Sequence, residues 1–293
     1  MKKLTDQVGL LGDGFCNFYV VGGKEAALVE CGTSAGAVIF AKQWAEVEDK
    51  PDIKYIVMLH SHFDHMCGIS QLKKLFPEAQ VVGSQVAQKL MSKERIVKMM
   101  FDYDVVVTES YLREGLIDEK PEAFQGETVE IDLVVGEGDS LRLGDGLQLK
   151  FLDAPGHSAC SMAAYVEEEQ VMLISDAAGF RSDTGQMSPV FFQDYGLYMN
   201  TIQKLMSYPT RIAGVAHGDV PEGAAVGTFY QQSLEAAEQA YEIVKNSLEK
   251  GIDEKALAEE MFNRYIEAPL SYYPSDMMLV SMQLLIENVK KTL

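Results

Sequence analysis

Short apolar runs alternate with turn residues along the first thirty positions of the chain. The runs cover residues 8–11, 18–21 and 26–30, and glycine-containing turns at 12–14 and 22–23 separate them. Runs of this length and spacing are typical of β-strands joined by tight turns. We therefore expect the chain to begin with a β-meander.

Helical and strand patterns alternate over the next sixty residues. Thr33 and Ser34 precede an apolar periodicity that predicts a helix to about residue 47. A buried strand is predicted over 53–59, a helix over 68–76, a strand over 80–83 and a further helix from Ser84. Residues 92–128 are helical in character but rich in charge, and we interpret them as an insertion. This half of the chain is predicted to be α/β.

Strand patterns return at residue 129, and helical patterns replace them towards the end of the chain. Predicted strands cover 129–135, 141–143, 147–152, 163–166, 171–174 and 212–215. After residue 227 apolar residues recur at three- and four-residue steps, and residues 275–293 are apolar on most faces. We predict a first domain over 1–226 and a helical extension over 227–293, which packs on that domain or forms a homodimer interface.

The composition is that of a soluble protein with a strong negative charge. Forty-four acidic residues against 25 basic ones give a net charge of −19, and 47% of the residues are hydrophobic. Such a charge repels a phosphate backbone, and we find no basic patch that offsets it, so nucleic acid is not an expected partner. No segment has the apolar length of a signal peptide or a membrane span. We expect a cytoplasmic protein with no membrane association.

All five histidines fall within three short segments. His60, His62 and His65 lie with Asp64 inside six residues, directly after the predicted strand over 53–59. The other candidates also follow predicted strands, namely His157, Asp176 and His217. A lone histidine such as His217 is more often structural, but this constellation reverses that expectation. Imidazole and carboxylate groups suit zinc, iron and manganese, and strand ends present functional side chains in α/β folds, so a metal site is predicted.

Two of the four cysteines stand close to these histidines in sequence. Cys67 lies two residues after His65, and Cys160 lies three residues after His157. None of the four cysteines has the paired spacing of a zinc ribbon or a disulfide framework. We expect Cys67 and Cys160 to be small buried core residues, with a place beside the metals as the alternative.

The segments around the histidines resemble those of the metallo-β-lactamase-fold hydrolases. Residues 60–65 read His-x-His-x-Asp-His, residues 155–158 read Pro-Gly-His-Ser, and the resemblance covers roughly residues 8–220. It implies a four-layer αββα sandwich with a dinuclear metal site at one edge. It further implies a first metal on His60, His62 and His157, a second on Asp64, His65 and His217, and Asp176 as the bridge between them.

Departures within this superfamily point to one branch. Asp176 stands where the β-lactamases proper have a cysteine, as in the glyoxalase II-like branch, and His62 stands where flavodiiron oxygen reductases have a glutamate. The segment after Asp176 and the helical tail resemble thioesterases of the quinolone-signal response type. That resemblance implies an aromatic acyl pocket beneath the C-terminal helices. The residues predicted to line it are Phe191, Phe192, Tyr195, Tyr272, Tyr273 and Met278.

The resemblance implies hydrolysis of a small-molecule ester or thioester by a hydroxide held between two divalent ions. Zinc is the first expectation for the metal, with iron or manganese as alternatives, and Asp64 is a candidate proton shuttle. A second hypothesis is an iron-dependent redox enzyme that acts on a sulfur or oxygen substrate. A third is a non-catalytic metal-containing sensor or partner-binding protein. The complete set of seven ligands favours two metals and hydrolysis.

Overall fold

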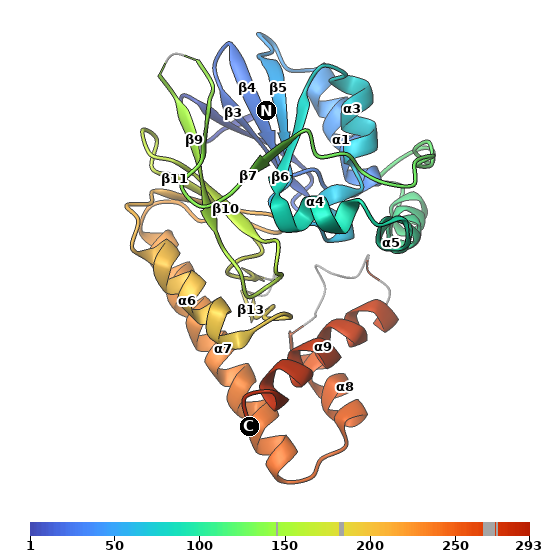
Figure 1. The fold of residues 1–293 in the computed structure, drawn as a ribbon, viewed down its shortest axis with the longest axis vertical. Helices are drawn as coiled ribbons and strands as arrows, with labels where there is room; N and C mark the ends of the chain where they lie inside the picture. Colours follow the sequence, from blue (N-terminus) through green and yellow to red (C-terminus); the bar gives the residue numbers. More distant parts are fainter. Residues whose placement is uncertain (145, 182–184, 266–272, 274) are drawn as a thin grey trace.

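The computed structural model describes residues 1–144, 146–181, 185–265, 273 and 275–293. Two β-sheets lie face to face, and helices cover their outer faces (Figure 1). The four-layer αββα sandwich with C-terminal helices is therefore confirmed. A separate two-stranded ribbon is formed by β12 (Phe180–Arg181) and β13 (Met187–Ser188).

The larger sheet has its strands in chain order, from the first to the seventh. The first four are antiparallel, which confirms the predicted meander, and β4 to β7 are parallel. The strands are β1 (Lys2–Lys3), β2 (Val8–Gly12), β3 (Asn17–Gly22), β4 (Glu25–Val29), β5 (Asp52–Val57), β6 (Gln80–Ser84) and β7 (Leu133–Val135).

The second sheet has the order β14-β11-β10-β9-β8. Its only parallel pair among the described strands is β11 with β14. The strands are β8 (Ser140–Arg142), β9 (Gln148–Asp153), β10 (Met162–Val166), β11 (Val171–Ser175) and β14 (Ile212–Val215). All five fall within or next to predicted strands.

Side chains alternate between two hydrophobic cores along the larger sheet. In β3, Tyr19 and Val21 pack in the core between the two sheets. Phe18 and Val20 point the other way, into the core beneath the outer helices. This alternation follows from the two-residue period of a strand. The larger sheet is therefore buried on both faces.

The helices beside the larger sheet begin close to their predicted starts, and polar side chains cap two of them. Thr33 caps α1 (Ser34–Ala45), and its side chain accepts a hydrogen bond from the Gly36 N–H at 2.9 Å. Ser84 caps α4 (Gln85–Met91) in the same way. The predicted helix over 68–76 is α3 (Ile69–Leu75).

Two predicted strands are shorter than their apolar patterns. β5 ends at Val57, before Met58 and Leu59, and β7 starts at Leu133 rather than at residue 129. Val129 is buried under the helices, where its N–H donates to the Met91 carbonyl. Burial alone therefore explains its apolar character.

The predicted insertion over 92–128 is a long helix followed by an irregular segment. The helix α5 (Glu94–Arg113) packs against α1 and α4 and against the short helix α2 (Phe63–Met66). Residues 114–132, all of which the structure describes, form no helix or strand. The insertion is therefore part of the main core rather than a separate lobe.

The C-terminal helices extend from the sandwich and fold back beneath its edge. In Figure 1, α7 (Ala224–Glu249) runs away from the sheets next to α6 (Tyr195–Met206), and α8 (Glu254–Tyr265) and α9 (Ser275–Lys290) return. The helix α7 starts at Ala224, shortly before residue 227, after which the helical pattern was expected. Gly223 adopts a φ of 59° and begins it, whereas Gly227 lies inside the helix. Among the described helices, none combines the length and apolar character needed to cross a membrane.

Candidate metal centre

The seven predicted metal ligands meet at one edge of the sandwich. His60 follows β5, and α2 begins directly after His62, so Asp64 and His65 are carried on its first turn. His157 follows β9, Asp176 follows β11 and His217 follows β14. The structure divides these side chains into two groups whose ligand atoms lie within 4.8 Å of one another: His60, His62 and His157, and then Asp64, His65, Asp176 and His217.

The first group consists of three imidazole rings whose nitrogens face one another. His157 Nε2 lies 3.2 Å from His60 Nε2 and 3.0 Å from His62 Nδ1. His157 Nδ1 is committed to the Val190 carbonyl at 2.8 Å. The proton of this ring therefore sits on Nδ1, and Nε2 presents a lone pair to the other two rings. Facing lone pairs repel one another unless a cation lies between them.

The second group combines two carboxylates with two imidazoles. Asp64 Oδ2 lies 3.4 Å from His65 Nε2 and 3.3 Å from His217 Nε2. Asp176 reaches both groups, since its Oδ2 lies 3.2 Å from His65 Nε2 and 3.5 Å from His157 Nε2. The carboxylate of Asp176 is thus placed between the two groups.

Outer hydrogen bonds fix the orientation of the ligating rings. His65 Nδ1 lies 2.8 Å from Glu30 Oε2, and His217 Nδ1 donates to the Phe15 carbonyl. His60 Nδ1 lies 3.1 Å from Ser175 Oγ. In each case the partner occupies the nitrogen that faces away from the centre, which leaves Nε2 directed inward.

Burial keeps the first group neutral. It lowers the pKa of His60 well below its usual range, and the neighbouring histidines lower it further. Burial and the adjacent His157 lower the pKa of His62 to about 3. Neutral imidazole is the form that ligates a metal, so no proton has to be displaced from these rings at neutral pH.

Charge dominates the second group. Burial favours protonated carboxyls, but His65 and His217 outweigh it and hold the pKa of Asp64 and of Asp176 well below the usual range. Burial also opposes a charge on His65, yet Asp64, Asp176 and Glu30 together raise its pKa well above its usual range. The two carboxylates are therefore ionised and draw a positive charge into the group.

These residues fit divalent metal ions. His65 Nε2 and Asp176 Oδ1 are buried atoms that have no hydrogen-bond partner among the described residues. Buried polar atoms are otherwise almost always paired, so unpaired atoms in a ligand cluster are what a cation-binding site requires. Neutral imidazoles with ionised carboxylates are the donor set of zinc, iron and manganese sites.

Two residues beside the centre were missed by the sequence patterns. Glu30 directly follows β4 and Ser175 is the last residue of β11, and their φ angles are 75° and 50°, values that non-glycine residues rarely adopt. Both contact His65 Nδ1, at 2.8 Å and 3.4 Å. Strained backbone of this kind clusters at functional sites. Glu30 could have been found from the sequence, because it is an acidic residue at the end of an apolar run, and the metal ligands also follow such runs.

Gly156 allows His157 to take its place. Its φ is 122°, and a Cβ atom there would lie 2.3 Å from the backbone N of Tyr198 on α6. The Gly156 carbonyl also accepts hydrogen bonds from the N–H groups of Gln193 and Asp194. The Pro-Gly-His segment is therefore clamped against the start of α6.

Cys67 and Cys160 are both buried, as expected, and Cys160 links the ligand loops. Its Sγ lies 3.3 Å from the Ser61 N atom and 3.3 Å from Ser158 Oγ. Ser61 stands between His60 and His62 in sequence, and Ser158 follows His157. Cys160 thus connects the segments that carry the first group.

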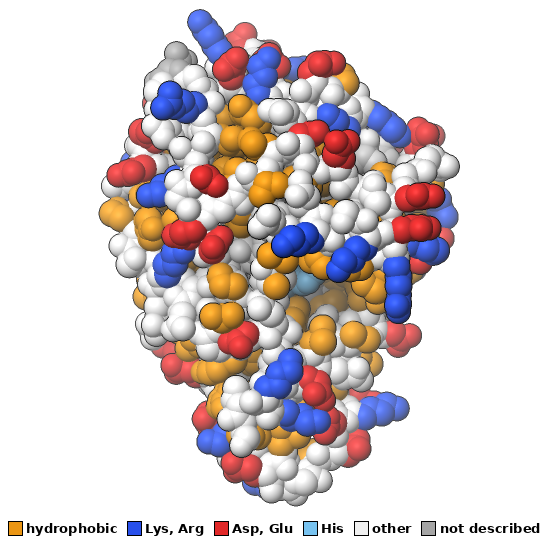
Figure 2. All heavy atoms as spheres, in the orientation of Figure 1, with side chains coloured by type: hydrophobic (Ala, Val, Ile, Leu, Met, Phe, Trp, Pro, Cys, Tyr) orange, Lys and Arg blue, Asp and Glu red, His pale blue; other side chains and the backbone are white. Residues whose placement is uncertain are grey.

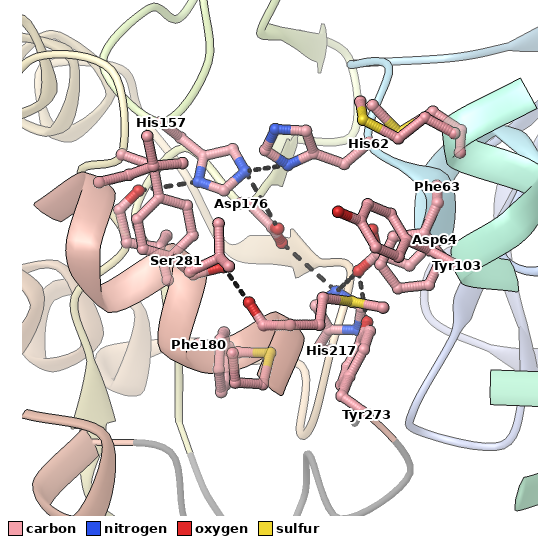
Figure 3. A pocket seen from close by; sticks show the side chains of 18 residues that line it. His62, Phe63, Asp64, Tyr103, His157, Asp176, Phe180, His217, Tyr273 and Ser281 are labelled. Carbon is pink, nitrogen blue, oxygen red and sulfur yellow. Dashed lines mark hydrogen bonds and ion pairs between the residues drawn. The ribbon is translucent and has the colours of Figure 1, made fainter. Parts of the chain in front are cut away.

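A cavity of about 300 Å³ opens directly above the ligands. Figure 2 shows the hollow with hydrophobic side chains around it and a histidine at its floor, and Figure 3 shows the lining residues. Four methionines from α5 and α9 form much of the wall: Met99, Met100, Met277 and Met278. The described residues that line the cavity include no lysine or arginine.

The predicted pocket residues separate into three sets. Phe192, Tyr273 and Met278 line the cavity. Phe191 and Tyr195 are not among the residues that line this cavity. Phe191 is fully buried against Tyr198, and Tyr195 stacks on Tyr241 of α7 with ring centroids 4.4 Å apart. Tyr272 lies outside the described residues.

Comparisons with known proteins support the resemblance seen in the motifs. A sequence profile described as the Metallo-beta-lactamase superfamily matches residues 11–217. The chain is 22% identical over 255 residues to the Metallo-beta-lactamase fold-containing protein ST1585 of Sulfurisphaera tokodaii, an alignment that covers 86% of this chain and 88% of the relative. The solved structure of ST1585 has a TM-score of 0.61, at 18% identity, and covers 98% of this chain and 99% of that one.

Two other relatives have names that indicate two different activities. The chain is 23% identical over 211 residues to an Atrochrysone carboxyl ACP thioesterase of Claviceps purpurea, with 70% of this chain and 51% of the relative aligned. It is 24% identical over 164 residues to the Putative diflavin flavoprotein A 2 of Synechocystis, with 56% of this chain and 23% of the relative aligned. The chain thus spans about half of the thioesterase and less than a quarter of the flavoprotein.

Proposed function

Because the chain belongs to the metallo-beta-lactamase superfamily, we propose that it is a metal-dependent hydrolase of a small-molecule ester or thioester with an apolar acyl group. One observation carries the proposal: the two ligand groups form the floor of an apolar cavity that is large enough for a small acyl group. The thioesterase relative supports a hydrolytic reaction, and it acts on a substrate held by a carrier protein according to its name.

In the proposed site the seven side chains would hold two divalent ions, with zinc as the first expectation. Ions in these positions would polarise a carbonyl oxygen and make water a nucleophile at neutral pH. One ion would take His60, His62 and His157, the other would take Asp64, His65 and His217, and Asp176 would lie between them.

The remaining steps fall to the side chains of the cavity. Asp64 is ionised, lines the cavity and can accept a proton from the attacking water and return it to the leaving group. The apolar wall excludes bulk water from the acyl group. Its methionines adapt to different shapes because their side chains are unbranched and flexible. The lack of a cation among the described lining residues disfavours an acyl group that carries a carboxylate.

Elemental analysis and a substrate panel test the proposal together. The protein is purified without added metal, its zinc, iron and manganese contents are measured, and thioesters, lactones and phosphodiesters are assayed. Two divalent ions per chain with turnover of an apolar thioester or ester is the expected result. A metal-loaded protein that hydrolyses none of the panel would contradict the proposal.

An iron-dependent redox reaction is the second candidate function, since part of this chain is similar in sequence to the flavoprotein relative. His62 argues against this candidate. It belongs to the first ligand group, at the position where flavodiiron oxygen reductases have a glutamate. Oxygen consumption by the iron-loaded protein with a thiol substrate, together with no hydrolysis, would favour this candidate over hydrolysis.

A further inference from the structure

Tyr273 reaches the metal centre from the C-terminal extension. It lies between the end of α8 and the start of α9, and its hydroxyl donates a hydrogen bond to Asp64 Oδ2 across 209 positions of sequence. Figure 3 shows the ring beside His217, with the hydroxyl directed at the Asp64 carboxylate. Only 8% of Tyr273 is exposed, so water competes little for this bond.

Two aromatic rings hold Tyr273 in this direction. The Phe15 ring lies 5.1 Å from it, tilted by 45°, and the Phe63 ring lies 5.3 Å from it, edge-on at 84°. Both neighbours are tied to the second ligand group, since the Phe15 carbonyl accepts a hydrogen bond from His217 Nδ1 and Phe63 directly precedes Asp64. The phenol is thus packed against the framework that supports the second ligand group.

The accepting atom is the Asp64 oxygen that faces the other ligands. Asp64 Oδ2 is the atom that lies 3.4 Å from His65 Nε2 and 3.3 Å from His217 Nε2. An ionised carboxylate oxygen has two lone-pair directions, so it can accept from a phenol and still face a cation. A hydrogen-bond donor on one lone pair therefore fixes the direction of the other lone pair.

We propose that Tyr273 is a positioning residue for Asp64, through which the C-terminal extension completes the second metal site. The hydrogen bond holds Asp64 Oδ2 towards His65 and His217 and limits rotation of the carboxylate. Outer-sphere partners of this kind typically change metal affinity by about 10–100-fold. This role rests on the proposed ligand function of Asp64 and is independent of the substrate.

Zinc affinity tests the proposal without any activity measurement. Tyr273→Phe keeps the ring and its contacts with Phe15 and Phe63 but removes the donor. Competition with a chromophoric chelator should show one zinc bound as in the wild type and the second bound about 10–100-fold more weakly. Tyr265→Phe is the matched control: this tyrosine is also buried in the extension, and its hydroxyl has no hydrogen-bond partner among the described residues.

A double-mutant cycle separates positioning from a general loss of stability. In an Asp64→Ala background the acceptor is gone, so adding Tyr273→Phe should leave zinc affinity unchanged within about twofold. Equal losses in the two backgrounds would overturn the proposal, as would a Tyr273→Phe protein that binds two zinc ions as tightly as the wild type. A wild-type chain that binds none of zinc, iron and manganese would instead refute the proposed function itself.

Discussion

Glu30 Oε2 and His65 Nδ1 lie 2.8 Å apart, and both side chains are almost fully buried. The pair connects the loop directly after β4 to the first turn of α2, so a residue at the edge of the larger sheet orients a ligand of the second group. The left-handed backbone of Glu30 shows that the fold accepts strain to place this carboxylate.

Replacing Glu30 with Gln should weaken the second metal site. The amide still accepts from His65 Nδ1 but no longer supplies a negative charge, so the ring becomes a poorer ligand. We expect zinc affinity at one of two sites to fall about tenfold or more. Isothermal titration with zinc measures the change, and Glu25→Gln, at the exposed start of β4, is the control. Unchanged binding of both ions would show that the charge of Glu30 is not needed.

Asp64→Asn tests the proton transfer. We expect kcat for an apolar thioester to fall about 10²-fold or more, because a neutral amide cannot take a proton from water. Metal content is measured on the same preparation, so that loss of metal and loss of the base are told apart. A variant with full metal content and a full rate would eliminate Asp64 as the proton carrier.

Filling the cavity should change substrate preference without affecting the metals. Met278 is buried in α9 and lines the cavity, so Met278→Trp reduces the space for an acyl chain. We expect kcat/KM for an octanoyl thioester to fall at least tenfold relative to that for an acetyl thioester. The acetyl substrate and the metal content serve as internal controls. An equal fall for both substrates would indicate that the cavity does not receive the acyl group.

Asp104 makes stability depend on pH. Burial raises the pKa of this α5 carboxyl to about 6, although it accepts a hydrogen bond from the Ser34 N–H. The folded chain therefore holds this proton more tightly than the unfolded chain, and the stabilisation from protonation is lost as the pH rises through about 6. Between pH 5 and pH 8 the wild type should lose about 1 kcal/mol relative to Asp104→Asn. Urea unfolding of both proteins at each pH measures the difference, with Asp102→Asn, an exposed aspartate of the same helix, as the control. A difference between Asp104→Asn and the wild type that stays constant across this range would contradict the expected titration.

Two glycine-to-alanine substitutions should change the stability of the fold in opposite directions. Gly156→Ala places a Cβ 2.3 Å from the Tyr198 backbone at a φ of 122°, so the clamp on His157 must open. We expect a loss of stability of about 2 kcal/mol or more and a loss of zinc at the first group. Gly227→Ala lies inside α7 with open space around it and should stabilise the fold by about 0.5–1 kcal/mol. Thermal unfolding of the metal-free proteins compares the two. A Gly156→Ala protein as stable as the wild type would refute the clamp.

The strands and helices could be predicted because their patterns are local, whereas the four-layer arrangement was implied by the resemblance of the histidine segments to a known superfamily. Strands and helix starts were recognisable from apolar runs and from residues such as Thr33 and Ser84. The boundaries of β5 and β7 were predicted wrongly for one reason. A buried position such as Val129 needs an apolar residue whether or not it belongs to a strand. A glycine likewise does not by itself mark a helix boundary, since Gly227 lies inside α7.

The sequence by itself determined which side chains are candidate ligands and that each follows a strand, since ligand chemistry and strand patterns are properties of short segments. The tertiary structure decided which partners those ligands have. Glu30 meets His65 and Tyr273 meets Asp64 only because segments far apart in the chain are packed together. The neighbours Phe191 and Phe192 were equivalent in sequence, yet only Phe192 lines the cavity. The direction of a side chain is set by the packing around it, which no local pattern contains.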